Sequence, residues 1–285
     1  MSNVNSVLEG AISALYVYPV KSCAAVRTSH AAVCATGLMF DREWMVVDTN
    51  GHFLTQRAHP RMALIQPAID DVGGAGKLTL CAPGMEDLGV DEPDELVSLT
   101  VKVWRDSVLA LDMGEHAAEW LSTFLNTPCR LVRFDKRDRR ICDATWTGAD
   151  GTSTYFADGF PLLVISAGAV SQLNSRMVQA GRDPVDVSRF RPNIVVDGWP
   201  AHAEDALSAF KVSEIVFRFV KPCTRCAIPD IDPRKGEVFN RVNDILRDYR
   251  RNPCMNGALT FGMNAVVNRG VGETLRTGQV LSGWE

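Results

Sequence analysis

Short apolar runs bounded by Gly, Pro, Asn and Asp dominate the first half of the chain. Such runs, with apolar residues often at every second position, are typical of β-strands. Asn50-Gly51 separates two of them and predicts a tight hairpin turn, because this pair readily adopts positive φ angles. The Gly-rich residues 70–80 lead into a strand pattern and not a helix, so they predict a hairpin loop, not a phosphate-binding loop. The predicted strands or hairpins span residues 13–20, 43–57, 63–69, 77–82, 97–104, 107–113 and 128–135.

Three other stretches carry apolar residues at helical spacing: 115–126, 166–180 and 241–251. Ser166 is placed to cap the second of these helices, and Gly181 to end it. The positions predicted to face inward are Ala117, Trp120, Leu121 and Phe124 in the first helix, Val170, Leu173 and Met177 in the second, and Val242, Ile245, Leu246 and Tyr249 in the third.

Further strand patterns follow in the second half, at 156–166, 190–198, 211–220, 258–268 and 279–283. Because the strands are many and short and do not alternate with helices, the sequence predicts a mainly β protein with a few helices, of the α+β class. A polar, Gly- and Thr-rich stretch at 136–153 predicts a connection between two barrel-like domains. We expect these domains to span residues 10–135 and 150–285.

Composition and charge exclude several classes of partner. The 285 residues are 46% apolar and 22% charged, and the net charge is −4, so the protein as a whole does not attract nucleic acid or anionic membranes. The chain has no apolar run of about 18 residues, and its first residues lack the pattern of a signal peptide. The sequence therefore predicts a cytoplasmic protein with no nucleic-acid or membrane partner.

Eight cysteines are scattered along the chain. This pattern predicts reduced thiols, most of them small buried residues, and not a disulfide framework. Only Cys223 and Cys226, in VKPCTRC at 220–226, have a spacing that suggests chemistry.

Several functions are conceivable for this pair. A thioredoxin-type couple would be followed by a helix, which Pro229 and Pro233 disfavour. A structural zinc site needs four ligands, and the five histidines are isolated. Two alternatives stay open from the residues alone: inert core thiols, or one thiolate that holds a soft metal whose other ligands come from a cofactor. Lys221 and Arg225 would favour the thiolate.

Eight motifs, spread over both halves, decide between these alternatives. They are YPVKSC (18–23), GLMFDREW (37–44), FLTQR (53–57), FADGFPLLVIS (156–166), FRPNIVV (190–196), AED (203–205), VKPCTRC (220–226) and FGMN (261–264). With these motifs in this order, the chain resembles the MOSC-domain molybdenum enzymes that carry an N-terminal MOSC β-barrel domain. That branch includes the amidoxime-reducing components and the bacterial reductases of N-hydroxylated bases.

The resemblance implies a molybdenum cofactor, a pterin whose dithiolene sulfurs bind Mo and which carries a phosphate. The second cysteine of the Cys-x-Arg-Cys string ligates the metal in the family, which implies Cys226 here, with Cys223 packing beside it. Asp158 is implied to lie near the metal and to handle a proton or orient a ligand. Basic, amide and hydroxyl side chains suit a phosphate and a pterin edge. The implied cofactor-binding residues are Lys21, Ser22, Arg42, Arg57, Arg191, Asn193, Thr224 and Arg225.

The implied reaction is a two-electron reduction of N-hydroxylated small molecules, such as hydroxylamines, amidoximes and N-hydroxylated nucleobases, to amines or amidines. Because the chain has no cysteines at iron–sulfur spacing, we expect a separate electron donor: a ferredoxin, a cytochrome b5-like protein or a flavoprotein reductase. Two alternatives remain. Cys226 could serve a sulfur carrier as a persulfide relay without molybdenum, or the protein could store the cofactor without turnover.

Overall fold

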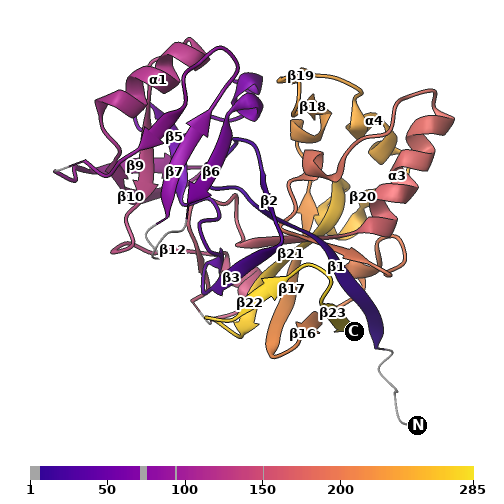
Figure 1. The fold of residues 1–285 in the computed structure, drawn as a ribbon. Coiled ribbons are helices and arrows are strands. Elements are labelled where there is room, and N and C mark those ends of the chain that lie inside the picture. Colours follow the sequence, from indigo (N-terminus) through magenta and orange to yellow (C-terminus); the bar gives the residue numbers. More distant parts are fainter. Residues whose placement is uncertain (1–6, 71–75, 94, 150) are drawn as a thin grey trace, which may run out of the picture.

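The fold consists of two β-rich lobes that lie side by side (Figure 1). The structure is a computed structural model and describes residues 7–70, 76–93, 95–149 and 151–285. One lobe carries α1 (Glu115–Leu125), and the other carries α3 (Ala167–Gln179) and α4 (Val242–Arg247). The prediction of a mainly β protein with few helices and barrel-like domains is confirmed.

A closed barrel forms the centre of the second lobe. Pairing between its first and last strands completes the ring. In spatial order its strands are β14 (Leu162–Ser166), β15 (Ile194–Asp197), β1 (Leu8–Val17), β23 (Val280–Trp284), β16 (Ala209–Val212), β17 (Ile215–Thr224) and β21 (Ala258–Arg269). Strand β1 thus comes from the beginning of the chain, and two short strands extend the sheet, β2 (Val26–Thr28) beside β1 and β20 (Arg251–Asn252) beside β21.

Two features shape the barrel near its closing seam. Gly262, in the FGMN motif, has φ +76°, and a Cβ there would lie 2.6 Å from the Ile165 side chain and 2.8 Å from the Val164 carbonyl. A side chain would therefore push β21 away from β14. The pairing of β17 with β21 also changes register around Lys221 and again near Thr224. Such bulges bend a strand and redirect its end, and here that end carries the two-cysteine motif.

The first lobe is an open half-barrel. Its main sheet has the order β5 (Trp44–Asp48), β11 (Cys129–Phe134), β10 (Asp106–Asp112) and β9 (Ser98–Val103). A second sheet has the order β6 (Gln66–Asp70), β7 (Lys77–Cys81) and β8 (Leu88–Val90). Two smaller groups are β22 (Thr274–Arg276) with β3 (His30–Cys34) and β4 (Gly37–Leu38), and β12 (Arg140–Ile141) with β13 (Ser153–Thr154). A third, β18 (Ile231–Asp232) with β19 (Glu237–Val238), lies in the second lobe near α4 (Figure 1).

The predicted helices form, with one change of length. All four inward positions of α1 are buried, and in α3 Leu173 and Met177 are buried while Val170 is partly so. The Ser166 hydroxyl accepts a hydrogen bond from the Ala169 amide, as predicted for a cap. Helix α4 ends earlier than expected, because the chain turns into β20. Among the described residues, no helix is long and apolar enough to cross a bilayer.

Of two hairpins predicted in the first lobe, one forms as expected and the other only in part. Strands β6 and β7 pair as a hairpin, as expected, although residues 71–75 lie outside the described residues. The run after Gly51 does not continue as a strand: it makes single bridges at His52 and Phe53 and then turns through Gln56 and Arg57. Phe53 and Leu54 still bond to the sheet, and only the last three residues of FLTQR leave it, which brings Thr55 and Arg57 to the cavity described below.

The eight cysteines are all free thiols, in agreement with the prediction. The expectation that most of them are buried is wrong. Only Cys23, Cys129 and Cys142 are buried; the others lie at strand ends, in loops or at a cavity wall and are partly or fully exposed.

Protonation of the half-buried His202 should make the stability of the fold depend on pH. Burial, together with Arg250 and Arg176, lowers the pKa of His202 to about 4. Because the unfolded chain binds a proton there at a higher pH than the folded chain does, stability is complete above about pH 6.5 and decreases as the pH falls toward 4. Between pH 7 and pH 5 we expect this residue to cost about 1 kcal/mol of unfolding free energy, allowing for its partial exposure.

His202→Asn tests this effect, since asparagine tolerates the left-handed backbone at φ 63°. Urea unfolding at both pH values should show a smaller pH-dependent loss in the variant than in the wild-type protein. His116→Gln, on the exposed face of α1, serves as the control. An unchanged loss in His202→Asn would contradict the assignment.

Candidate functional site

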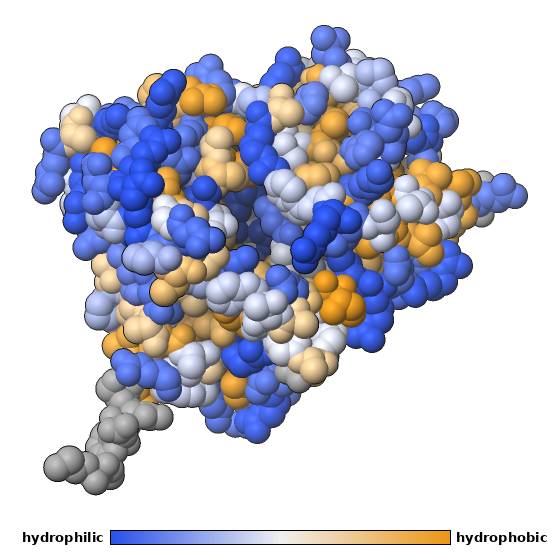
Figure 2. Space-filling view, turned by 180° about the vertical axis from the view of Figure 1, so that it is seen from behind, coloured by the Kyte–Doolittle hydropathy of each residue, from blue (hydrophilic) through white to orange (hydrophobic). Residues whose placement is uncertain are grey.

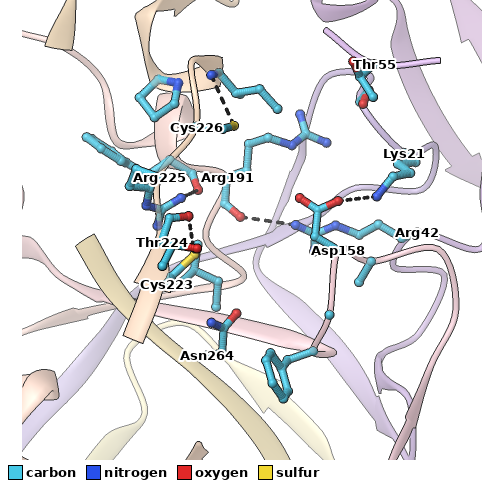
Figure 3. Close-up of a pocket in the computed structure, with 18 of the residues that line it drawn as sticks. Lys21, Arg42, Thr55, Asp158, Arg191, Cys223, Thr224, Arg225, Cys226 and Asn264 are labelled. Atoms are coloured by element: carbon cyan, nitrogen blue, oxygen red, sulfur yellow. Dashed lines mark hydrogen bonds and ion pairs between the residues drawn. The ribbon is translucent and has the colours of Figure 1, made fainter. Parts of the chain in front are cut away.

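A cavity between the two lobes brings together most of the predicted site residues. Figure 2 shows a hollow between the lobes with hydrophilic residues at its base. Nine of the ten residues line one cavity: Lys21, Ser22, Arg42, Arg57, Asp158, Arg191, Thr224, Arg225 and Cys226. In Figure 3, Cys226 lies on one side of this space, and Lys21, Arg42 and Asp158 lie on the other. Cys226 and Asp158 come from loops of the second lobe, after β17 and before β14, whereas Lys21 and Arg42 lie beside β5 of the first lobe, so the site requires both.

The loop after β17 holds Cys226 at the cavity wall. The Arg225 guanidinium donates to the carbonyls of Phe190, at 2.9 Å, and Phe261, at 3.0 Å. The Asn243 amide donates to the Cys226 carbonyl at 2.7 Å. These bonds fix the loop to three other segments, while the Cys226 thiol stays partly exposed with the Ile228 amide 3.5 Å from its sulfur. Arg225 therefore positions the loop, although the sequence suggested that it contacts a cofactor.

The two thiols of the motif lie in different environments. Cys223 packs against an apolar cluster that includes Leu163, Ile165 and Phe261, and burial raises the pKa of its thiol. This position agrees with the packing role expected for Cys223, although its side chain also reaches the cavity wall.

Lys21 and Asp158 form an ion pair across the lobes. The Lys21 ammonium donates to the Asp158 carboxylate at 2.5 Å and to the Phe156 carbonyl at 2.7 Å. The Asp158 side chain is 66% exposed, and the Trp104 indole also donates to it, at 3.1 Å. Desolvation opposes the carboxylate charge, but Lys21 and Trp104 outweigh it and hold the pKa of Asp158 well below its usual range. Burial lowers the pKa of Lys21 despite this partner.

Two arginines share one aromatic ring. The guanidinium of Arg42 lies 4.3 Å from the centre of the Tyr18 ring, and that of Arg191 lies 4.2 Å from it. Arg42 also pairs with the buried Asp41, and Arg191 donates to the Cys23 carbonyl at 2.6 Å. The Tyr18 ring thus holds two like charges at one wall of the cavity, where cation–π attraction offsets part of their repulsion.

Unusual backbone geometry accompanies these side chains. Ser22, Arg42 and Arg191 have positive φ values of 67°, 50° and 58°. Non-glycine residues rarely adopt this conformation, and when they do they concentrate at functional sites, where the surrounding structure compensates for the strain. The conformation directs three predicted site residues into one cavity.

Asn193 is the one predicted residue that the structure does not bring to the cavity. It is fully buried, and its amide donates to the Tyr16 carbonyl and to Asp41. Its oxygen accepts from Arg42 at 3.0 Å and from the Leu163 amide at 3.1 Å. Because every polar atom of this amide is occupied, Asn193 links β1, β14 and Arg42 and has no free group for a ligand.

This network predicts a large stability loss for Asn193→Ala. The substitution leaves several buried donors and acceptors without partners, so we expect the free energy of unfolding to fall by about 3 kcal/mol. Urea denaturation measures this change. Asn268→Ala, at the exposed end of β21, is the control and should change stability by less than about 0.5 kcal/mol. Equal effects of the two substitutions would contradict the role of the network.

Sequence reasoning missed several residues at this site. Arg189 is buried, pairs with Asp232 at 3.3 Å and also lines the cavity. Thr55 and Asn264 line it too, and the Asn264 amide donates to the Lys221 carbonyl. The FLTQR and FGMN motifs contain Thr55 and Asn264, so the motifs themselves were the signal. Trp104 carried no such signal. It contacts Asp158 only because it lies in the turn between β9 and β10, and a strand pattern does not predict the direction of a side chain in a turn.

The charge of the cavity suits an anion. Its lining includes Lys21, Arg42, Arg57, Arg189, Arg191 and Arg225, and Asp158 is the only acidic side chain among the described lining residues. An excess of cations on low-dielectric walls attracts phosphate or another anionic group. A free, partly exposed thiol at the same wall adds one soft ligand.

Two domain families match nearly the whole chain. The MOSC N-terminal beta barrel domain matches residues 9–128, and the MOSC domain matches residues 151–282. The chain therefore belongs to the MOSC-domain proteins that carry both domains, a family with molybdenum-related functions.

Curated relatives place the chain within this family. It is 33% identical over 254 residues to mitochondrial amidoxime-reducing component 1 of Mus musculus, covering 85% of this chain and 72% of that protein. The human protein of the same name is 32% identical over 253 residues with the same coverage. Human molybdenum cofactor sulfurase is 32% identical over 278 residues, which cover 90% of this chain but 30% of that protein. The relatives are thus enzymes linked to the molybdenum cofactor.

The cavity fits such a cofactor on its own chemistry. A molybdenum pterin needs positive groups for its phosphate and a soft sulfur ligand that completes the metal coordination. The cations and the Cys226 thiol supply both in one space.

Proposed function

We propose that this protein is a molybdenum-cofactor-dependent reductase of N-hydroxylated compounds, such as amidoximes, hydroxylamines and N-hydroxylated nucleobases. One observation carries the proposal: a free thiol, a cluster of cations and a single paired carboxylate line the same cavity between the two lobes. The similarity to amidoxime-reducing components supports the same reaction class.

The residues of the chain would share the work as follows. Cys226 would ligate the metal, and Arg42, Arg57, Arg189 and Arg191 would hold the anionic part of the cofactor. When bound, the cofactor supplies the two-electron chemistry that cleaves the N–O bond. Arg225 and Asn243 hold the loop that presents the thiol, so the ligand is fixed before the cofactor binds.

Asp158 is the candidate for proton handling. It faces the cavity, is 66% exposed and is held as a carboxylate by Lys21 and Trp104. A carboxylate at this place can orient the N-hydroxyl group and accept or relay a proton during its reduction. Lys21 positions this carboxylate through its two hydrogen bonds.

Electrons would come from a separate protein: a ferredoxin, a cytochrome b5-like protein or a flavoprotein reductase. We propose a cytoplasmic location for the reaction, which fractionation of the source cells can test.

A second function has its own support. The similarity to molybdenum cofactor sulfurases favours a role in which Cys226 carries a persulfide and relays sulfur. The partly exposed thiol beside the basic side chains of the cavity would suit that role as well.

One preparation distinguishes these functions. The protein is made in a host that synthesises the cofactor and is analysed for molybdenum, pterin and cyanide-labile sulfur. About one Mo per chain, and reduction of benzamidoxime with an artificial reductant, support the reductase. Labile sulfur without Mo supports the relay, and Mo without reduction leaves only cofactor storage.

A further inference from the structure

A second cavity opens beside the first and shares three residues with it. Asp158, Gly159 and Phe160 line both cavities, so a molecule in the second one can reach the carboxylate of the first. Its other walls come from both lobes and from the segment between them, and include Phe53, Trp104, Arg140 and Lys221. None of the functions assigned above uses this space.

Trp104 occupies a strained turn at this cavity. It joins β9 to β10 with φ 57°, a conformation that a bulky side chain rarely adopts. The residue is nonetheless 46% exposed, which is unusual for tryptophan. Core packing therefore does not explain the large aromatic side chain at this strained position. Such outliers concentrate where function requires a particular side-chain direction.

The contacts of Trp104 connect it with the proposed site. Its indole donates to Asp158 at 3.1 Å, the Arg57 guanidinium lies 4.5 Å from its ring, and the Phe53 ring centre lies 5.1 Å away. Two of these partners, Asp158 and Arg57, also line the first cavity. The ring is thus fixed at the border of the two spaces, with part of its surface open.

The most buried charged group of the second cavity, Arg140, is already paired within the protein. Its guanidinium pairs with Asp106, at 2.8 Å, and donates hydrogen bonds to the carbonyls of Tyr155, Ala157 and Asp158. It therefore fixes the loop that carries Asp158 and offers little to a ligand. The apolar surfaces in the lining are the aromatic side chains Phe53, Trp104 and Phe160 and the exposed Ile141. They lie beside the charged side chains Arg105, Asp143 and Lys221.

We propose that this second cavity binds the ring of an aromatic or heteroaromatic N-hydroxylated substrate, with Trp104 as the principal ring contact and Asp158 at the N-hydroxyl end. The proposal rests on the reductase function proposed above and names its substrate class: planar aromatic amidoximes and hydroxylamino-heterocycles over small aliphatic ones. Aromatic contacts of this kind change binding by about three- to tenfold.

Two variants of Trp104 separate its roles. Trp104→Leu removes both the ring and the indole N–H, whereas Trp104→Phe keeps a ring and loses only the hydrogen bond to Asp158. We expect Trp104→Leu to raise KM for benzamidoxime by about three- to tenfold relative to KM for acetamidoxime, and Trp104→Phe to keep most of that preference. Any loss of kcat caused by the missing hydrogen bond should be equal for the two substrates, because both depend on Asp158.

The test includes a measurement without turnover. Saturation-transfer NMR with benzamidoxime, in the absence of reductant, should show a signal in wild type and Trp104→Phe that weakens in Trp104→Leu. Leu109→Ala, an exposed apolar residue on β10 outside the cavity, is the control and should change neither measurement. Circular dichroism and the molybdenum content of each variant verify that the fold and the cofactor are retained.

The outcomes are distinct. If molybdenum-loaded protein reduces benzamidoxime and Trp104→Leu changes the two substrates equally, the substrate assignment is wrong and the reductase function stands. If the wild-type protein holds no molybdenum or reduces neither substrate, the reductase function fails. A benzamidoxime NMR signal that Trp104→Leu leaves unchanged overturns the cavity assignment in either case.

Discussion

Cys226→Ser should abolish reduction of N-hydroxylated substrates and lower the molybdenum content of the purified protein. A serine hydroxyl stays protonated near neutral pH and is a poor ligand for a soft, sulfur-bound metal, whereas a thiolate is a good one. The loop itself should be unaffected, because Arg225 and Asn243 hold it through main-chain carbonyls. We expect at least a 100-fold loss of activity, judged against the 10- to 100-fold effects of residues that only support a ligand.

Two other cysteines give matched controls for this experiment. Cys254→Ser replaces an exposed thiol away from the cavity and should leave molybdenum content and activity unchanged. Cys223→Ala removes a thiol that packs against the apolar cluster. It should lower the free energy of unfolding and leave the molybdenum content near that of the wild-type protein. Full activity and full molybdenum content in Cys226→Ser would refute the assignment of the ligand.

Asp158→Asn should reduce kcat by about 100-fold while molybdenum content stays near that of the wild-type protein. The amide keeps the size of the side chain but cannot take up a proton, and it leaves the buried Lys21 ammonium without its counter-charge. Steady-state kinetics with two substrates of different size measure the loss. Asp248→Asn, an exposed carboxylate beyond α4, is the control.

The Lys21–Asp158 ion pair determines how the charge state of Asp158 changes with pH. Because the pKa of Asp158 is held below its usual range, the carboxylate persists as the pH falls, and its attraction to Lys21 is lost only under strongly acidic conditions. At high pH the pair is lost when Lys21 gives up its proton, which burial makes easier than in water. Asp158 should therefore not limit activity of the free enzyme between pH 5 and pH 7. An acid limb in that range that disappears in Asp158→Asn would contradict this.

The sequence predicted most elements of this fold because its apolar patterns are local and regular. Helices α1 and α3 follow from inward-facing residues at helical spacing, and the Ser166 cap follows from side-chain chemistry alone. The hairpin after Asn50 was only partly right, because His52 and Phe53 also pair with Lys102 of β9 and the chain leaves β5 after Leu54. Tertiary contacts of this kind leave no periodic signal in the sequence.

For the site, too, the sequence motifs predicted which residues come together but not which groups each of them contacts. The motifs identified nine residues that meet in one cavity, but residue type did not reveal which of them face a ligand. Arg225 bonds to carbonyls, and Asn193 is buried in a network, although both carry groups that could bind a pterin. Trp104 was missed because its position depends on a left-handed turn, and tryptophan has no preference for that conformation.

The place of β1 between β15 and β23 has a consequence for how the protein is made. Strand β1 can complete its pairing only after β15 and β23 have been synthesised, so the ring cannot close while the segment between them is still being made. A cut in the segment between the lobes would separate β1 from the rest of the barrel. The half that carries Cys226 would then have unpaired edges at β15 and β23. Under the proposed function, a cofactor that needs the closed barrel would therefore bind only after β23 has paired with β1.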